Sequence, residues 1–289
     1  MRAGMFGGMD LDDYRRASLD QWERSAEGWG ARREQLQRLA APVSTWMIEA
    51  IAPQPGGVVL ELAAGPADTG LLAAERVRPG GRLICSDFAE PMLEVARARA
   101  AELGLDNVEF RALNAESLDL EAASVASVLC RWGYMLMADP AAALRETRRV
   151  LVPGGSVALA AWDDASSNPW VDVIASEIRQ RLDAPAPDPS APSMFAFAPP
   201  GRLQGLLDDA GFTDVDILPL DFEMRYHSAE DWWAMQLDLG RPLGDLIASR
   251  SAQEREEIRA AVLDLGRDFA RDDGTLVFPA RTLVASASA

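Results

Sequence analysis

Lysine is absent from this chain of 289 residues, because all 28 basic side chains are arginines. Schiff-base catalysis and a phosphate loop ending in Gly-Lys-Ser/Thr are therefore excluded, since both need the lysine amine at a fixed place. Histidine occurs once, as His227. Zinc sites built from several histidines are excluded as well, and any Ser-His-Asp triad would have to use this one ring.

Cysteine is almost as scarce, with Cys85 and Cys130 only. Two cysteines are too few for a disulfide framework or a thiolate cluster, so we expect two buried reduced thiols and no metal site. No apolar run approaches the roughly 18 residues of a membrane span, and the N-terminus lacks a basic region followed by an apolar run. We therefore expect a cytoplasmic protein without a membrane partner.

Basic side chains are far fewer than acidic ones, 28 against 45, which gives a net charge of −17 at pH 7. Nucleic acids and anionic membranes attract basic surfaces, so this balance disfavours both as partners and favours a small neutral or cationic substrate. The chain is 48% hydrophobic and 25% charged, as is typical of globular proteins. This length predicts one large domain, or one domain with a cap, and it leaves a homodimer open.

Residues 56–163 alternate short apolar runs with longer amphipathic segments, a pattern typical of a parallel sheet with helical crossovers. Helices are expected at Ala89–Leu103 and after Asp139, which precedes a proline at the first helical position. A helix is expected after each strand, which predicts right-handed crossovers and a doubly wound sheet. The expected strands are Gly57–Leu62, Arg82–Ser86, Val108–Leu113, Val125–Arg131 and Ser156–Trp162.

Further elements flank this block. Residues 10–52 predict two amphipathic helices, and the proline-rich residues 184–200 predict a loop. Strands are expected near Val215–Met224 and Leu276–Ala285, with helices between them that begin in capping boxes at Ser228 and Ser251. We therefore expect a helical cover over 1–55, a core over 56–165, and a segment over 166–289 that completes the sheet and adds a helical cap.

The first expected strand ends in an acidic residue and a turn of small residues, which lets backbone amides approach a ligand. The turn reads Glu61-Leu-Ala-Ala-Gly-Pro-Ala-Asp-Thr-Gly70. The dinucleotide fingerprint needs three glycines, where this chain has Ala63, Gly65 and Asp68. An NAD(P) enzyme is therefore an alternative that the missing glycines oppose.

Polar residues also follow the next two expected strands. Asp87 lies 22 residues beyond Gly65, where a carboxylate can accept from both ribose hydroxyls, although it could instead cap the following helix. Asn114-Ala-Glu116 is placed to read an adenine edge, although Asn114 could instead form a turn. Their occurrence at three successive strand ends favours a nucleoside-containing cofactor.

These motifs resemble those of the class I S-adenosylmethionine-dependent methyltransferases, especially the ubiquinone/menaquinone-type and natural-product branch. Residues 61–70 resemble the family's first motif with Ala67 in place of a usual glycine, and Ser86-Asp-Phe-Ala-Glu-Pro-Met92 resembles the second. Asn114-Ala-Glu resembles the third, and Leu144-x-Glu146-x-x-Arg149-Val-Leu-x-Pro-Gly-Gly resembles the segment before the fifth strand. The resemblance, over roughly residues 55–165, implies a Rossmann-like fold with a seven-stranded, mostly parallel sheet, N-terminal helices and a C-terminal helical cap.

The resemblance also implies that S-adenosylmethionine is the cofactor and suggests a role for each residue. Glu61 would meet the methionyl ammonium group, Asp87 would bind the ribose, and the Cys130 carbonyl would also meet the ammonium group. Ala67 would need a negative φ or would shift the cofactor slightly. The remaining residues expected at the cofactor are Trp29 in a covering helix, Ala63, Gly65, Phe88, Met92, Asn114, Ala115 and Glu116.

The expected reaction is methyl transfer to oxygen, nitrogen or carbon of a small, aromatic or apolar acceptor, in which the protein positions a nucleophile and excludes water. His227, Tyr134 and Asp163 are the candidate catalytic residues, with His227 as proton acceptor or as a structural residue. The residues expected to contact the acceptor are Trp22, Trp132, Tyr134 and Trp162. A methyltransferase-fold protein that catalyses cyclisation or only binds its ligand remains an alternative.

Overall fold

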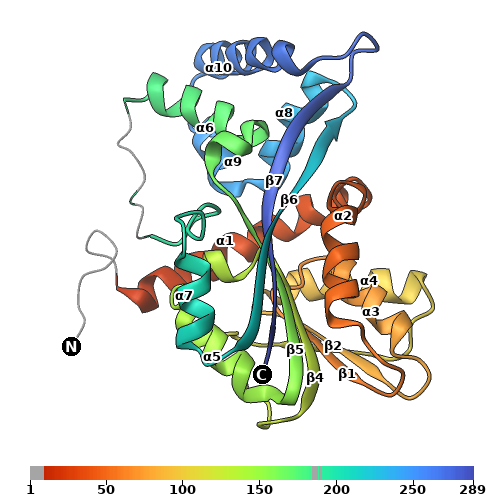
Figure 1. The fold of residues 1–289 in the computed structure, drawn as a ribbon. Helices are drawn as coiled ribbons and strands as arrows, with labels where there is room; N and C mark the ends of the chain where they lie inside the picture. Colours follow the sequence, from red (N-terminus) through yellow and green to blue (C-terminus); the bar gives the residue numbers. More distant parts are fainter. Residues whose placement is uncertain (1–9, 184–187, 189–190) are drawn as a thin grey trace.

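A computed structural model describes residues 10–183, 188 and 191–289 of the chain, and its centre is one seven-stranded sheet (Figure 1). The strand order is β3-β2-β1-β4-β5-β7-β6. The first five strands pair in parallel, and β7 is antiparallel to both β5 and β6. The predicted mostly parallel, doubly wound sheet is therefore confirmed. The strands are β1 Val58–Glu61, β2 Arg82–Asp87, β3 Val108–Ala112, β4 Val125–Arg131, β5 Leu151–Trp162, β6 Thr213–Tyr226 and β7 Leu276–Ser288.

The helices divide between the two ends of the sheet (Figure 1). Helices α3 and α4 lie beside the parallel strands, whereas α6, α8, α9 and α10 gather around the far halves of the long strands β6 and β7 and form the helical cap. Helix α1 runs between these regions and contacts α4, α8 and α9. The α-helices are α1 Leu11–Ala31, α2 Arg33–Ile51, α3 Asp68–Arg76, α4 Glu90–Glu102, α5 Pro140–Val150, α6 Pro169–Arg181, α7 Arg202–Asp209, α8 Ala229–Leu239, α9 Arg241–Ala248 and α10 Ala252–Leu265.

The connection from β3 to β4 corrects the expectation that a helix follows every strand. Residues 113–124 form turns and no helix. Side chains of α5 satisfy this backbone instead: Glu146 accepts from the Leu118 amide, and Arg149 donates to the Leu118 and Leu120 carbonyls. A crossover without a helix is stable here because α5 supplies its hydrogen bonds.

Two expected boundaries also change. Strand β5 begins at Leu151 rather than Ser156, because its pairing with β4 shifts register between Val125 and Ser127. Of the two expected capping boxes, only that at Ser251 is reciprocal. At Ser228 the hydroxyl accepts from the Asp231 amide, but the Asp231 carboxylate accepts from the amide of His227, one residue too early for the box.

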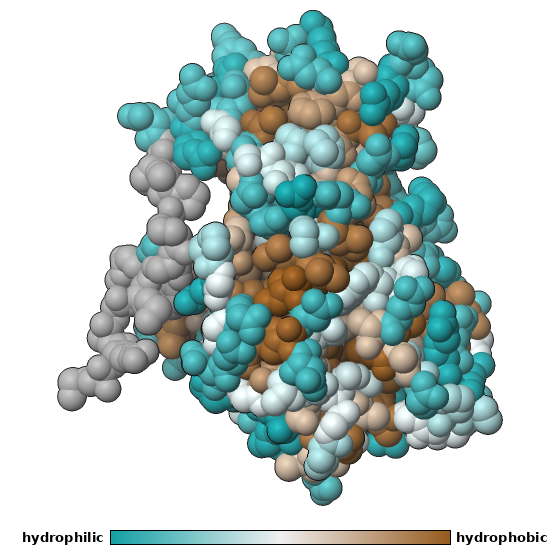
Figure 2. Space-filling view, viewed as in Figure 1, coloured by the Kyte–Doolittle hydropathy of each residue, from teal (hydrophilic) through white to brown (hydrophobic). Residues whose placement is uncertain are grey.

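Apolar side chains pack on both faces of the sheet, and the inner strands β1, β2 and β4 are mostly buried, whereas the edge strands β3 and β6 are largely half-buried or exposed. Figure 2 shows hydrophilic residues over much of one face, with apolar residues gathered midway down the molecule and again near its top. No helix in the described part of the chain is long and apolar enough to cross a bilayer. Of the predicted proline-rich loop, residues 184–187 and 189–190 lie outside the described residues, and 191–200 form turns.

Candidate active site

A cavity of about 420 Å³ lies at the carboxyl ends of β1, β2, β3 and β4, beneath α1. This edge of an open α/β sheet is where such folds bind ligands. The structure brings together most of the site residues predicted from sequence. Those that line the cavity are Trp22, Trp29, Glu61, Ala63, Gly65, Asp87, Phe88, Met92, Asn114, Ala115, Glu116 and Trp132.

The turn after β1 reaches the cavity through left-handed backbone. Ala63, Gly65 and Ala67 have φ values of 49°, 53° and 63°. The expectation that Ala67 needs a negative φ is therefore wrong, because its methyl group is tolerated in the left-handed region at a cost of about 1–2 kcal/mol. Gly133 after β4 permits the close approach of the two turns, since a Cβ there would lie 2.6 Å from that of Ala63.

Glu61 ends β1 beneath this turn and is 3% exposed. One carboxylate oxygen accepts from the Gly70 amide at 2.8 Å, whereas Oε2 has no hydrogen-bond partner within the described structure. Burial raises the pKa of Glu61 to about 8, although Arg131 and the Gly70 amide act in the opposite direction. Glu61 is thus a buried acid on the cavity wall, with one oxygen that lacks a donor and lies against Gly70 of α3.

Arg131 is the cation beneath the cavity, at the end of β4, with a side chain that is 9% exposed. Its guanidinium donates to the Ser44 hydroxyl at 3.2 Å, lies 3.6 Å from the Asp68 carboxylate and stacks over the Trp132 ring. Asp68 is buried, neither of its oxygens accepts a described hydrogen bond, and burial raises its pKa. We call Glu61, Asp68, Asp87 and Arg131 the buried charge cluster.

Asp87 joins the turn after β1 to the start of α4. One of its oxygens accepts from the Gly65 amide at 2.9 Å, and the other accepts from the Ala89 amide at 3.0 Å. Burial raises the pKa of Asp87, and these backbone donors oppose the rise. Asp87 therefore bonds the residue before α4 without capping the helix itself, fixes the small-residue turn and lines the cavity.

At the end of β3, Asn114 and Glu116 lie on the cavity wall. The Asn114 side-chain carbonyl accepts from the Glu116 amide at 2.9 Å, so the turn foreseen as an alternative role is present. The Glu116 carboxylate accepts from Arg15 of α1 at 2.6 Å and 2.9 Å. Tyr14 adds a second tie by donating to the Leu136 carbonyl at 2.9 Å. These bonds hold the first half of α1 over the cavity.

Apolar side chains from α1 meet those that follow β2. Trp22, Trp29 and Leu19 pack with Phe88 and Met92 in one cluster. Trp22 and Trp29 make an edge contact, and the Trp29 indole donates to the Leu239 carbonyl of α8. The covering helix expected from the sequence is therefore present, and it also reaches the helical cap.

Trp132 forms the wall after β4 in an unusual backbone conformation, with φ of 59°. Its indole donates to the Thr282 hydroxyl at 3.0 Å and stacks on Trp162 with ring centres 4.3 Å apart. A bulky residue in the left-handed region is strained, and such strain persists where surrounding contacts fix it. Trp162 itself lies behind Trp132, so the expectation that it contacts the acceptor is corrected: it supports the residue that lines the cavity.

Several known proteins have sequences similar to that of this chain. A family model described as a methyltransferase domain matches residues 53–185. The nocamycin O-methyltransferase of Saccharothrix syringae is 32% identical over 199 residues, covering 65% of this chain and 71% of that protein. The chain belongs to the S-adenosylmethionine-dependent methyltransferases.

Other known proteins are also similar to this chain. The arsenite methyltransferase of Halobacterium salinarum is 31% identical over 208 residues, which cover 72% of this chain but only 49% of that protein. The chain thus spans about half of that relative. The crystal structure of the YcgJ protein from Bacillus subtilis has a TM-score of 0.56 at 20% identity, covers 85% of this chain and 97% of that one, and shares the fold.

Two residues predicted for the methyltransferase site lie behind the cavity wall. Tyr134 is 1% exposed, its hydroxyl pairs with that of Thr147 at 2.6 Å, and burial raises its pKa well above the usual value. The catalytic and acceptor-binding roles expected for Tyr134 are therefore corrected, because its hydroxyl faces α5. The Cys130 side chain is also fully buried, and burial raises its pKa to about 12; the role of its carbonyl stays a prediction.

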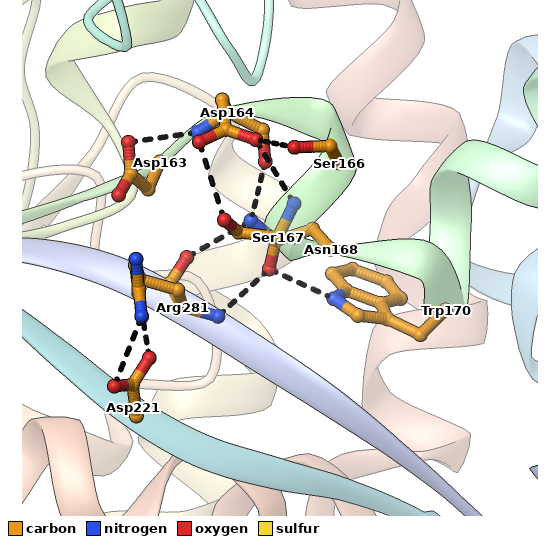
Figure 3. Close-up of polar contacts among 8 residues, drawn as sticks. All are labelled: Asp163, Asp164, Ser166, Ser167, Asn168, Trp170, Asp221 and Arg281. Atoms are coloured by element: carbon orange, nitrogen blue, oxygen red, sulfur yellow. Dashed lines mark hydrogen bonds and ion pairs between the residues drawn. The ribbon is translucent and has the colours of Figure 1, made fainter.

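Asp163, predicted to be catalytic, belongs to a different polar group (Figure 3). Its carboxylate accepts from the Asp164 amide at 2.8 Å, and its own amide donates to the Arg281 carbonyl. Asn168 completes this group. Its side chain donates to the Arg281 carbonyl and accepts from the Arg281 backbone amide and from the Trp170 indole. The structure thus places Asp163 where the start of α6 is tied to β7, outside the cavity wall.

His227, the other predicted catalytic residue, is exposed between β6 and α8 and does not line the cavity. Its amide donates to the Asp231 carboxylate, which also accepts from Arg32 and Gln35 of the N-terminal helices. The structural role that the sequence left open fits this position. The expected role as a proton acceptor receives no support from the geometry.

Sequence reasoning missed several residues of the site. Tyr14, Arg15, Arg131 and Met137 all line the cavity. An arginine closing the buried strand β4 was the available signal for Arg131, because buried arginines need partners. Tyr14 and Arg15 carried no such signal, since their contacts are made across the fold.

Proposed function

We propose that this methyltransferase binds S-adenosylmethionine in the cavity and transfers its methyl group to a small organic acceptor. The observation that carries the proposal is the buried Glu61 carboxylate, which lines the same cavity as Asp87 and has one oxygen without a described donor. A buried acceptor without a donor is costly, and a cationic ligand group would satisfy it. When bound, the cofactor supplies a methyl group activated by a sulfonium centre.

The residues present fit this cofactor along the whole cavity. Glu61 would hold the ammonium group, Asp87 the ribose hydroxyls, and the amides that follow Ala63 and Gly65 allow close approach. Adenine would lie against the remaining wall, between apolar side chains and the polar edge after β3. The residues proposed there are Phe88, Met92, Asn114, Ala115 and Glu116, with Trp29 covering the site from α1.

The part of the wall formed by α1 and the segment after β4 supports an apolar, flat acceptor. Leu19, Trp22, Trp132, Leu136 and Met137 line it. Aromatic rings bury large areas and stack on flat ligands. The protein's contribution would be to position the acceptor and exclude water under α1.

Arsenite, named for one relative, is a poor candidate acceptor for this chain. Trivalent arsenic is a soft centre that favours thiolate ligands. The chain has two cysteines, both buried, and neither side chain lines the cavity. These facts support an organic acceptor.

Calorimetric titration tests the cofactor proposal directly. We expect S-adenosylhomocysteine to bind and NAD to show no binding, because the turn after β1 lacks the dinucleotide glycines. Asp87→Ala should weaken S-adenosylhomocysteine binding at least 100-fold, since a buried ribose-binding carboxylate would be lost. Asp163→Ala removes the same side chain outside the cavity and should leave binding unchanged. Absence of binding to the wild type would refute the proposal.

Mass spectrometry tests the acceptor. The protein is incubated with S-adenosylmethionine and a panel of phenols, hydroxyquinones and amines, and products heavier by one methyl group are sought. We expect products from flat aromatic acceptors and a large loss of turnover in Trp132→Ala. Products formed only from sugars or peptides would contradict the proposed acceptor class.

Three broader expectations stay proposals. The net charge of −17 supports a cytoplasmic protein whose partners do not include nucleic acids. The proposed division of the chain is a helical cover over residues 1–55, a cofactor-binding core over 56–165, and a segment over 166–289 that completes the sheet. The helical cap belongs to this last segment and would lie over the acceptor. Sedimentation of the purified chain distinguishes a monomer from a homodimer.

A further inference from the structure

The buried charge cluster holds more negative charge than its own cation can balance. It contains the carboxyl groups of Glu61, Asp68 and Asp87 and one guanidinium, that of Arg131. Asp87 is satisfied by two backbone amides, and Arg131 pairs with Asp68 and Ser44. Glu61 is left with one amide donor for its two oxygens.

The neighbours of Glu61 are fixed by close packing. A Cβ on Gly70 would lie 2.1 Å from Glu61 Oε2, so α3 presses directly against the carboxyl group. The titratable and charged groups facing it are Asp68 on α3, Asp87 and Cys85 on β2, and Arg131 and Cys130 on β4. Among these groups only Arg131 favours the ionised form of Glu61, and the Gly70 amide acts in the same direction, whereas desolvation and the carboxylates oppose it.

We propose that Glu61 is protonated in the empty cavity and releases its proton to solvent when the cofactor's ammonium group binds beside its carboxyl group. The ammonium group keeps its own proton, so one carboxyl group becomes a carboxylate and one proton leaves for each cofactor bound. This inference rests on the proposed function, because it requires the cofactor in this cavity. Cofactor binding is then linked to pH by a residue of this chain.

The sign of the linkage follows from the two states of Glu61. The pKa of Glu61 is raised to about 8 in the ligand-free protein, and a bound cation beside it lowers that value. Below pH 8, binding must therefore displace a proton, which weakens apparent affinity as the pH falls. Affinity should rise about tenfold from pH 6 to pH 7 and level off above pH 8.

Titration calorimetry with S-adenosylhomocysteine measures the released proton without an acceptor or turnover. The observed enthalpy is compared in phosphate and Tris buffers at pH 7, since the two differ in ionisation enthalpy. We expect roughly 0.9 proton released per ligand at pH 7 and about half a proton at pH 8, as follows from a pKa near 8.

Two variants assign the proton to its residue. Glu61→Gln should bind with no proton release and with affinity independent of pH between 6 and 8. Glu102→Gln is the matched control, because Glu102 is an exposed glutamate outside the cavity lining and is paired with Arg99, and this variant should still release the proton. If Glu61→Gln does not fold, the buffer dependence and pH profile of the wild type decide.

Wild-type protein that binds S-adenosylhomocysteine with equal enthalpy in both buffers would overturn the inference while leaving the proposed function standing. Proton release by Glu61→Gln equal to that of the wild type would also overturn it. Absence of ligand binding throughout is a different result, which would refute the proposed function and this inference together.

Discussion

The buried charge cluster and the helical cap are built in opposite ways. In the cluster, Glu61 and Asp68 are buried with oxygens that lack hydrogen-bond partners. In the cap, the fully buried Trp232 donates its indole N–H to the Trp170 carbonyl at 2.8 Å and packs its ring on Phe278. One region leaves polar groups unsatisfied, and the other satisfies the polar group of its largest side chain.

Stability and ligand binding depend on different regions of this molecule. Unsatisfied buried acceptors reduce stability, but a ligand that satisfies them gains the same free energy on binding. Aromatic packing in which the polar groups are already hydrogen-bonded stabilises the fold and leaves no unpaired polar group for a ligand to bind. Substitutions in the cap should therefore change stability, and substitutions around the cluster should change cofactor affinity.

The largest effect is expected from Trp232→Ala in the cap. Removing a fully buried tryptophan should cost about 3–5 kcal/mol of unfolding free energy, because it leaves a large cavity among the packed aromatic side chains. Chemical denaturation measures the loss. S-adenosylhomocysteine affinity of the folded fraction should stay within about threefold; loss of binding at unchanged stability would contradict the division between the two regions.

Gly70→Ala tests whether the buried charge cluster determines cofactor affinity. The new Cβ would lie 2.1 Å from Glu61 Oε2 and 2.7 Å from its carboxyl carbon, so Glu61 must move out of place. We expect about a 100-fold loss of S-adenosylhomocysteine affinity, which corresponds to about 2.7 kcal/mol. Calorimetry measures it, and unchanged affinity would show that the position of Glu61 is unimportant for binding.

Gly205→Ala in α7 is the matched glycine change away from both regions. A Cβ there meets no described atom within 4 Å, and alanine favours the helix more than glycine does. We expect the unfolding free energy to rise by about 0.5–1 kcal/mol with no change in ligand affinity. A destabilised Gly205→Ala would mean that α7 differs from the helix described.

His227→Ala should have the smallest effect. The side chain is exposed, and its amide keeps the bond to Asp231 after substitution. Stability should change by less than about 0.5 kcal/mol, and turnover should be that of the wild type at every pH from 6 to 8. A fall in turnover with a changed pH profile would restore His227 as a proton acceptor.

The strand ends were predictable because their chemistry is local. Glu61, Asp87 and Asn114 follow short apolar runs, and a parallel sheet brings such positions to one edge. The connection after β3 was predicted wrongly because Glu146 and Arg149, far along the chain, supply its hydrogen bonds. Ala67 was misjudged because its backbone angle is imposed by the turn rather than by the residue.

The sequence by itself determined the sheet and its strand-end motifs, since apolar periodicity and small-residue turns act over a few residues, and the resemblance of those motifs to the methyltransferase family implied the cofactor. Only the tertiary structure decided which side chains face the cavity. Tyr134 and His227 look chemically apt but point elsewhere, whereas Tyr14 and Arg131 reach the cavity from α1 and β4. The direction of a side chain depends on packing between distant elements, and that information is present only in the folded chain.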